Sequence, residues 1–291
     1  MSADTATARG PGRIATIDCL RGIAALGVCV FHMTTTADAS FLPKGDVLRE
    51  VGFAGQYGVE SFFVISGFVI PWSLSRRRYR VASYGRFMAR RVVRLDPTYL
   101  VVIALTLILN FASARFPGYR GEPFRIDLVQ VLLHLGYVNV FFGYPWLNSV
   151  FWSLAIEFQY YVFVGLAFPL IASRSAAFRG IVLATLAGSA LLLPDRRFLF
   201  LYMPLFVAGI LAFHHHERLV RTRVYLLALA VTTTLAWWML GGASAAVAAA
   251  TAICISFLRI EGRFLAFLGA ISYSLYLVHA LVGSRVINAS L

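Results

Sequence analysis

The sequence contains 291 residues, of which 59% are hydrophobic and only 13% are charged, and its mean hydropathy is +0.76. The charged share is about half that of an ordinary soluble domain, so it is too small to cover this much apolar surface in water. A soluble globular protein is therefore excluded, and the lipid bilayer is the expected environment of most of the chain.

The net charge of +13 comes mainly from short basic blocks that lie between apolar runs. This distribution is typical of the cytoplasmic loops of membrane proteins, so we expect no nucleic acid as a partner. The three cysteines lie inside apolar runs and have no paired spacing. We therefore expect neither a disulfide framework nor a zinc site.

The apolar runs predict an all-α, polytopic transmembrane helix bundle of about nine to ten membrane segments. Residues 1–12 are polar and small, and we expect a flexible cytoplasmic tail there, followed by one transmembrane domain over residues 13–291. The first run ends in a histidine and lacks a small-residue cleavage site, so we interpret it as a retained span rather than a signal peptide. The expected segments cover residues 16–35, 53–74, 98–113, 127–142, 150–172, 180–193, 198–213, 224–240, 243–258 and 264–284.

An arginine block between the second and third segments indicates the direction of the chain. Eight arginines lie between Ser75 and Pro97, which favours a cytoplasmic position for this connection and for the N-terminus. Ten spans would then place the three arginines of residues 214–223 outside, against the same rule. The conflict disappears if residues 127–142 dip into the membrane and return, which would leave the C-terminus outside. The sequence leaves open whether this segment spans or is re-entrant.

Ionisable side chains inside the apolar runs are candidates for function, because charges are costly and rare in lipid. His32 follows Arg21 by eleven positions, so the two side chains share a helical face, about 16 Å apart. Histidine can accept a proton near neutral pH, whereas arginine stays charged. His32 is thus a candidate base, and Arg21 could pair with Asp18 or hold an anionic group. An interfacial arginine and a histidine bonded to a neighbouring helix would be the simpler alternative.

Two acidic residues lie in later apolar runs. Glu60 lies in GVESFFVISGF and could orient His32 or hold an acceptor hydroxyl, unless it is simply solvated at the mouth of its span. Glu157 follows Ser153 by four residues in FWSLAIEFQYY, so the two side chains project together. Trp152, Tyr160 and Tyr161 in the same stretch suit a membrane interface or a sugar-binding wall.

The arginine block has a helical pattern of its own. Arg86, Arg90 and Arg94 recur every four residues on one face, and Arg91 lies beside that face. Arginine forks match phosphate oxygens, so this face could bind lipid headgroups or a phosphorylated cofactor. A purely topological role for these arginines is the alternative.

Two stretches with histidine remain. In SYSLYLVHA, Tyr273, Tyr276 and His279 are three residues apart and form a polar stripe on the last helix. The run HHHER at 214–218 is a poor metal site, because neighbouring helical residues point about 100° apart. We expect no bound metal.

Taken in order, the Arg-x10-His helix, GVESFFVISGF, RRVVRLDPTY, WSLAIE and SYSLYLVH resemble the acyltransferase 3 family of integral membrane O-acyltransferases. The resemblance extends over roughly residues 14–285. It implies transfer of an acyl group, often acetyl from acetyl-CoA, to a hydroxyl of a carbohydrate or related acceptor, without a metal. It also implies an integral protein of the bacterial cytoplasmic membrane that modifies polysaccharides of the cell envelope.

By the same resemblance, His32 and Arg21 correspond to the family's essential histidine and arginine. The resemblance and the residue chemistry together give one set of expected roles. Catalytic roles are expected for His32, Arg21, Glu60 and Glu157; acyl-CoA contacts for Arg21, Arg90, Arg91 and Arg94; and acceptor contacts for Asp18, Trp152, Ser153, Tyr273 and His279. His32 would take the hydroxyl proton or carry the acyl group as a transient acyl-imidazole.

A transporter or flippase for an anionic or lipid-linked sugar is the alternative function, because it would also need buried arginine, histidine and glutamate. Transporters often contain an internal repeat, and the sequence shows none. Members of the acyltransferase 3 family usually continue with a further helix after the SYSLYLVH-type motif, whereas this sequence ends twelve residues after His279.

Overall fold

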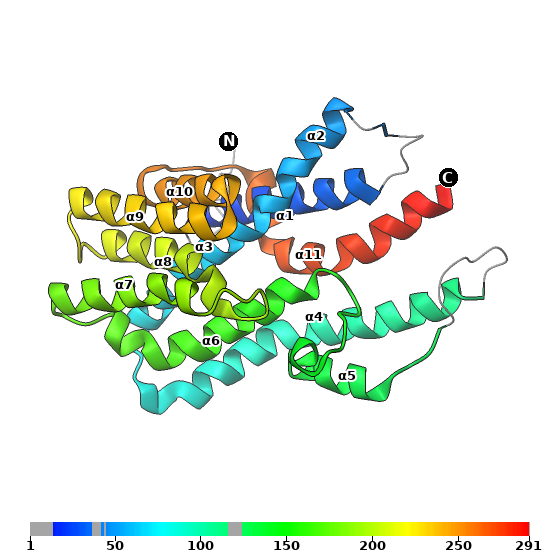
Figure 1. The fold of residues 1–291 in the computed structure, drawn as a ribbon, viewed down its shortest axis with the longest axis horizontal. Helices are drawn as coiled ribbons and strands as arrows, with labels where there is room; N and C mark the ends of the chain where they lie inside the picture. The colour runs from blue at the N-terminus through cyan, green and yellow to red at the C-terminus, as the bar shows by residue number, and fades with distance from the viewer. Residues whose placement is uncertain (1–13, 37–41, 44, 116–123, 291) are drawn as a thin grey trace, which may run out of the picture.

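In the computed structural model of the chain, residues 14–36, 42–43, 45–115 and 124–290 are described, and they contain helices but no strand. The predicted tail over residues 1–12 lies outside these ranges. The longer helices run roughly along the long axis of the molecule (Figure 1). They are α1 (Ala15–Thr36), α2 (Val47–Ala54), α3 (Gly58–Arg76), α4 (Tyr84–Ser113), α5 (Leu128–Leu135), α6 (Phe151–Ile171), α7 (Ala176–Leu192), α8 (Leu199–His216), α9 (Thr222–Leu240), α10 (Gly242–Phe257) and α11 (Arg263–Ser290), with 3-10 turns at Gly55–Tyr57, Val81–Ser83 and Asn139–Phe142.

Seven helical segments of the described chain are long and apolar enough to cross a membrane. Two further apolar helices, α7 and α10, have 17 and 16 residues. The predicted all-α polytopic bundle is therefore confirmed, and the chain is an integral membrane protein.

Residues 127–142 do not form one membrane segment. Only α5 is an α-helix there, and its eight residues extend about 12 Å, far less than the thickness of a bilayer core. The helix stops at Gly136, and Tyr137 follows with a positive φ of 58°, which turns the chain. The structure therefore decides the open question against a full span.

His134 stabilises this turn. Its Nε2 accepts a hydrogen bond from the backbone N–H of Leu147 at 3.1 Å, so the proton lies on Nδ1, which donates to the carbonyl of Gln130 at 2.7 Å. Burial lowers the pKa of His134, which favours this neutral form. One imidazole thus ties α5 to the chain that leads into α6.

The second half of the arginine block is helical, as its four-residue spacing predicts, whereas Arg77, Arg78 and Arg80 lie in the turn between α3 and α4. Helix α4 has 30 residues and begins at Tyr84, well before the segment expected at 98–113. It therefore extends about 45 Å, longer than the bilayer core is thick, so part of it must project beyond the lipid tails. The connections α3–α4, α6–α7 and α8–α9 lie at one end of the molecule, at the left in Figure 1, and the C-terminal ends of α4 and α11 lie at the other.

Helix α8 forms the centre of the bundle. It is apolar all round, as expected for a helix surrounded by protein, and 83% of its span is buried. Phe206 stacks on Tyr160 of α6 with a centroid distance of 4.1 Å, and it contacts Phe63 of α3 at 5.0 Å. This core fixes α3 and α6, which carry much of the site, against one rigid element.

Glycines allow the helices around the site to cross closely. A Cβ on Gly209 of α8 would overlap the carbonyl oxygen of Val64 in α3, and one on Gly67 would overlap the carbonyl of Phe206. The α1–α11 crossing uses the same device, because a Cβ on Gly269 would meet the carbonyl of Asp18. Small residues at such crossings allow backbone contact that lipid cannot replace.

Replacing Gly209 by alanine should therefore destabilise the protein. We expect Gly209→Ala to cost about 1–3 kcal/mol through overpacking, and to lower the thermal unfolding midpoint in detergent. Gly180→Ala in α7 is the matched control, because a Cβ there meets nothing within 4 Å, and alanine favours a helix. An unchanged midpoint for Gly209→Ala would contradict the close crossing.

Candidate active site

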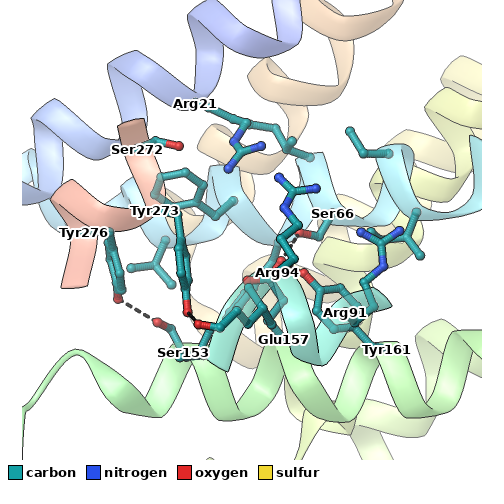
Figure 2. A pocket seen from close by; sticks show the side chains of 18 residues that line it. Arg21, Ser66, Arg91, Arg94, Ser153, Glu157, Tyr161, Ser272, Tyr273 and Tyr276 are labelled. Atoms are coloured by element: carbon teal, nitrogen blue, oxygen red, sulfur yellow. Dashed lines mark hydrogen bonds between the residues drawn. The ribbon is translucent and has the colours of Figure 1, made fainter. Parts of the chain in front are cut away.

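A narrow cavity of about 80 Å³ lies between α1, α3, α4, α6 and α11, and arginines line it. Arg21 enters it from α1, and Arg91 and Arg94 enter it from α4 (Figure 2). We call it the arginine cavity. Its full lining is Arg21, Val59, Phe62, Phe63, Ile65, Ser66, Val69, Ile70, Arg91, Arg94, Leu95, Ser153, Leu154, Glu157, Tyr161, Ser272, Tyr273 and Tyr276.

Glu157 is the acidic residue of this cavity. One of its carboxylate oxygens, Oε1, accepts hydrogen bonds from the hydroxyl of Ser66, at 2.9 Å, and from the hydroxyl of Tyr161. Its charge also acts on Arg21 and Arg91. The carboxylate therefore partly neutralises the cationic cavity and is itself held in place by donors from two helices.

Aromatic rings position Arg91. Its guanidinium lies 5.2 Å from the ring centre of Phe87 and 5.3 Å from that of Tyr161. Such cation–π contacts stabilise a partly buried arginine without neutralising its charge. Arg91 therefore remains available to bind an anion in the cavity.

Tyrosines of α11 close one side of the arginine cavity. The hydroxyls of Tyr276 and Ser153 are 2.6 Å apart, and the Tyr273 hydroxyl donates to the carbonyl of Leu95 at 2.8 Å. Figure 2 shows both tyrosines reaching from α11 toward α6 and α4. The polar stripe expected on the last helix thus ties α11 to two other helices.

A second, wider cavity of about 510 Å³ contains His32, and we call it the histidine cavity. Glu60 faces it from α3 and accepts a hydrogen bond from the hydroxyl of Ser244 in α10 at 2.8 Å. Its full lining is Val28, Phe31, His32, Gln56, Tyr57, Val59, Glu60, Ser149, Val150, Trp152, Arg196, Leu201, Tyr202, Met239, Leu240, Ser244 and Tyr276. His32 therefore faces a polar cavity and not the lipid.

His279 packs against His32 from behind. The two ring centroids are 4.9 Å apart, and the rings are nearly perpendicular, at 79°. Nδ1 of the buried His279 lies 2.7 Å from the carbonyl of Tyr276, so this nitrogen carries the proton and donates it. His279 thus supports the ring of His32 but does not line the histidine cavity.

The two cavities adjoin. Val59 and Tyr276 line both of them and form the wall between them. Helix α1 runs past both, with Arg21 in the arginine cavity and His32 in the histidine cavity. A cavity lined by three arginines and a cavity that contains His32 therefore lie back to back in the protein.

The structure divides the predicted site residues between these places. Arg21, Arg91, Arg94, Ser153, Glu157 and Tyr273 line the arginine cavity, whereas His32, Glu60 and Trp152 line the histidine cavity. Asp18 and Arg90 line neither, although the charge of Asp18 acts on Arg21. Glu157 and Glu60, expected to serve one centre, are thus on opposite sides of the wall.

Several residues of the two cavities were not predicted in their places. Tyr161 was expected at an interface or a sugar-binding wall, whereas it lines the arginine cavity and donates to Glu157, four residues before it on the same face. Ser244 lies in an alanine-rich run that signals only close helix packing, and Tyr202 and Arg196 belong to no motif. These residues line the cavities because of the way distant helices pack together. The spacing of residues along one helix does not specify that packing.

A metal centre has no support within residues 14–36, 42–43, 45–115 and 124–290, where no group of three or more histidine, cysteine or acidic residues could hold an ion. His214 is instead buried, with Nε2 2.9 Å from the carbonyl of Ile171.

Comparison with known proteins gives the family. A sequence model of the acyltransferase 3 family, described as an acyltransferase domain, matches residues 14–288. Acyltransferase MdmB of Streptomyces mycarofaciens is 31% identical over 161 residues, which are 54% of this chain and 39% of that protein. O-acetyltransferase OatA of Staphylococcus aureus (strain NCTC 8325 / PS 47) is 29% identical over 164 residues, 53% of this chain and 24% of that protein.

The chain thus matches less than half of the length of these curated relatives. No solved structure is significantly similar to it.

The hydrogen bond from Ser66 to Glu157 should be important for stability, because a carboxylate in this cavity has few donors. We expect Ser66→Ala to cost about 1.5–3 kcal/mol, typical of a hydrogen bond to a charged group, measured as a lower unfolding midpoint. Ser73→Ala in the same helix is the control, because the Ser73 hydroxyl makes no hydrogen bond within the described part of the chain. Equal midpoints for the two variants would contradict this role of Ser66.

Proposed function

The chain belongs to the acyltransferase 3 family, and on this premise we propose that it is a membrane-bound O-acyltransferase. It would move an acyl group, in the simplest case acetyl, from acyl-CoA to a hydroxyl of a carbohydrate or related acceptor. The single observation that carries the proposal is the pair of adjoining cavities, one lined by arginines and the other by His32 and Glu60.

The arginine cavity suits the donor. Coenzyme A carries several phosphate charges, and arginine forks bind phosphate oxygens with two parallel hydrogen bonds. Arg21, Arg91 and Arg94 would hold the phosphates near the mouth of the cavity, and Arg90 could assist from the exposed face of α4.

The direction of the chain fits a cytoplasmic donor. Because α5 is too short to span, the remaining long and short apolar helices alternate in direction, and the basic connections after α3, α6, α8 and α10 all fall on one side. The positive-inside rule makes that side cytoplasmic, where acyl-CoA is made available. We place the protein in the bacterial cytoplasmic membrane on this basis.

The chemistry would take place at the wall between the cavities. His32 would accept the proton of the acceptor hydroxyl while its oxygen attacks the thioester carbonyl, and the carbon–sulfur bond would then break. The imidazolium would return the proton to the departing thiolate. Alternatively, His32 would attack first and pass the acyl group on from an acyl-imidazole. A positioned base of this kind contributes about 10²–10⁴ to the rate.

The structure limits the identity of the acceptor less than that of the donor. OatA is an O-acetyltransferase and MdmB an acyltransferase by name, which supports a hydroxyl acceptor for this chain. Trp152 and Tyr202 give the histidine cavity aromatic surfaces, and Glu60 and Ser244 give it polar groups, a combination that suits a sugar. We therefore propose a glycan of the cell envelope as the acceptor class.

Removing the imidazole should abolish transfer. We expect His32→Ala to lower the rate of acyl transfer at least about 100-fold, because the variant lacks the base. The rate is measured as transfer of label from acetyl-CoA to a panel of glycans by the protein in nanodiscs. Size-exclusion chromatography checks that the variant is folded. A folded His32→Ala protein with normal activity would exclude this mechanism. Solute movement in liposomes without acyl-CoA would instead favour the transporter.

Removing the cavity arginines should weaken donor binding. We expect the double variant Arg91→Ala/Arg94→Ala to raise the Kd for coenzyme A at least about tenfold, and the loss should be greater at low salt. Calorimetric titration in nanodiscs measures this Kd. The double variant Arg80→Ala/Arg86→Ala, at two exposed positions outside the cavity, is the charge-matched control and should change the Kd little. An equal effect of this control would indicate non-specific attraction.

A further inference from the structure

We propose that the histidine cavity continues into a second compartment, that the two together accept an extended acceptor, and that Arg196 binds a negatively charged group of this acceptor. This inference rests on the proposed function and deepens it, because it specifies the chemical class of the acceptor. The group would be a carboxylate or a phosphate, one chemistry with two sources that the experiment below distinguishes.

The second compartment is a cavity of about 410 Å³, which we call the tryptophan cavity. It shares three residues, Trp152, Arg196 and Tyr202, with the histidine cavity. The rest of its lining is Val140, Trp146, Ala155, Ile156 and Arg197. Each of the two compartments lies within the size range of small-ligand sites, so together they have room for more than one sugar unit.

The shared residues suit an extended sugar chain. The rings of Trp152 and Tyr202 are 5.6 Å apart and inclined by 36°, so they form a continuous aromatic surface from one compartment to the other. Trp146 extends the aromatic lining of the tryptophan cavity. Aromatic side chains of this kind combine a large apolar face with a polar atom, as a hydroxyl-rich ring requires.

Arg196 is the cation at the junction. The neighbouring Arg197 is already paired, because its guanidinium contacts both carboxylate oxygens of Asp195, at 2.6 Å for the shortest contact. Their contact lowers the pKa of Asp195 and keeps that carboxylate charged. Arg196, in contrast, has no hydrogen bond or ion pair with any residue in the described part of the chain. Its guanidinium is therefore available to an anion in either compartment.

The position of Arg196 also matches the reaction. It lies in the connection between α7 and α8, which the alternation of the helices places on the side opposite the arginine cavity. A cation here cannot serve the donor phosphates, because the wall of Val59 and Tyr276 lies between. Arg196 is exposed at this end of the molecule, so the acceptor, which on the proposed function enters from the same side, is the ligand that can reach its guanidinium.

The test measures KM for three disaccharide acceptors, with the full chain in nanodiscs and labelled acetyl-CoA as the donor. They are cellobiose, which is neutral, cellobiouronic acid, which carries a carboxylate, and cellobiose 6′-phosphate. We expect lower KM values for the charged sugars than for cellobiose. Arg196→Gln should raise KM for the preferred charged sugar about tenfold and leave KM for cellobiose unchanged, because it removes a charge-assisted hydrogen bond. The charged sugar whose KM rises more in Arg196→Gln shows whether the negative group is a carboxylate or a phosphate.

Two further variants control for the substitution of Arg196 and for the loss of a positive charge. Arg196→Lys keeps the charge and should restore part of the preference, which a merely structural role would not predict. Arg115→Gln removes a positive charge at the end of α4, on the same side of the membrane but outside all three cavities, and should change none of the KM values. Equal KM values for charged and neutral sugars, or an Arg196→Gln effect that includes cellobiose, would overturn the inference.

Failure of the proposed function would look different. If no acceptor is acylated, tryptophan fluorescence can follow binding of cellobiouronic acid and cellobiose 6′-phosphate without acetyl-CoA. Binding that Arg196→Gln weakens would then support the anion site and contradict the acyltransferase. Fluorescence that does not respond to either charged sugar would contradict the site.

Discussion

The site depends on one constraint: a carboxylate surrounded by apolar helices must be met by donors from the protein, because lipid supplies none. The chain has one such carboxylate in each cavity. Glu157 receives the hydroxyls of Ser66 and Tyr161, and Glu60 receives the hydroxyl of Ser244. Glu157 therefore joins α6 to α3, and Glu60 joins α3 to α10. The hydrogen bonds that satisfy these two carboxylates thus also fix the positions of the helices that line the cavities.

Helix α1 likewise contributes to both cavities. One helix carries the cation of the arginine cavity and the imidazole of the histidine cavity, eleven residues apart, so their separation is set by helix geometry and not by loop conformation. Glycines at the α1–α11 and α3–α8 crossings let these helices approach until backbone meets backbone. Rigid separation is what a transfer between two compartments needs, because a shift of about 1 Å in the reacting groups costs a large part of the rate.

The sequence predicted the helices and the face shared by Arg21 and His32, because apolar runs and a 3.6-residue period are local properties. It did not predict that Val59 and Tyr276 divide the site into two cavities. Spacing shows that Ser153 and Glu157 project together, but not that Glu60 projects into a different cavity. Periodicity likewise groups Arg86 with Arg90 and Arg94, whereas Arg91 and Arg94 line the cavity, since a period defines faces and not what each face meets. The sequence left residues 127–142 open for a similar reason: a short apolar helix has the same composition as part of a membrane segment, and only its length in the structure excludes a full span.

On the proposed function, the two adjoining cavities would let a donor and an acceptor enter from opposite sides and meet only at the wall of Val59 and Tyr276, where the thioester carbon and the acceptor oxygen must come into contact. Only the acyl carbon and its sulfur need to reach Val59 and Tyr276, while the phosphates of the donor stay among the arginines. The acceptor in turn needs to present one hydroxyl to His32, and the rest of it can occupy the wider space beyond. Tyr276, held by Ser153 at 2.6 Å, belongs to the helix that also carries His279 behind the His32 ring. Tyr276 of the wall and His279 behind the base therefore lie on one helix, so the position of α11 determines both the wall and the support of the His32 ring.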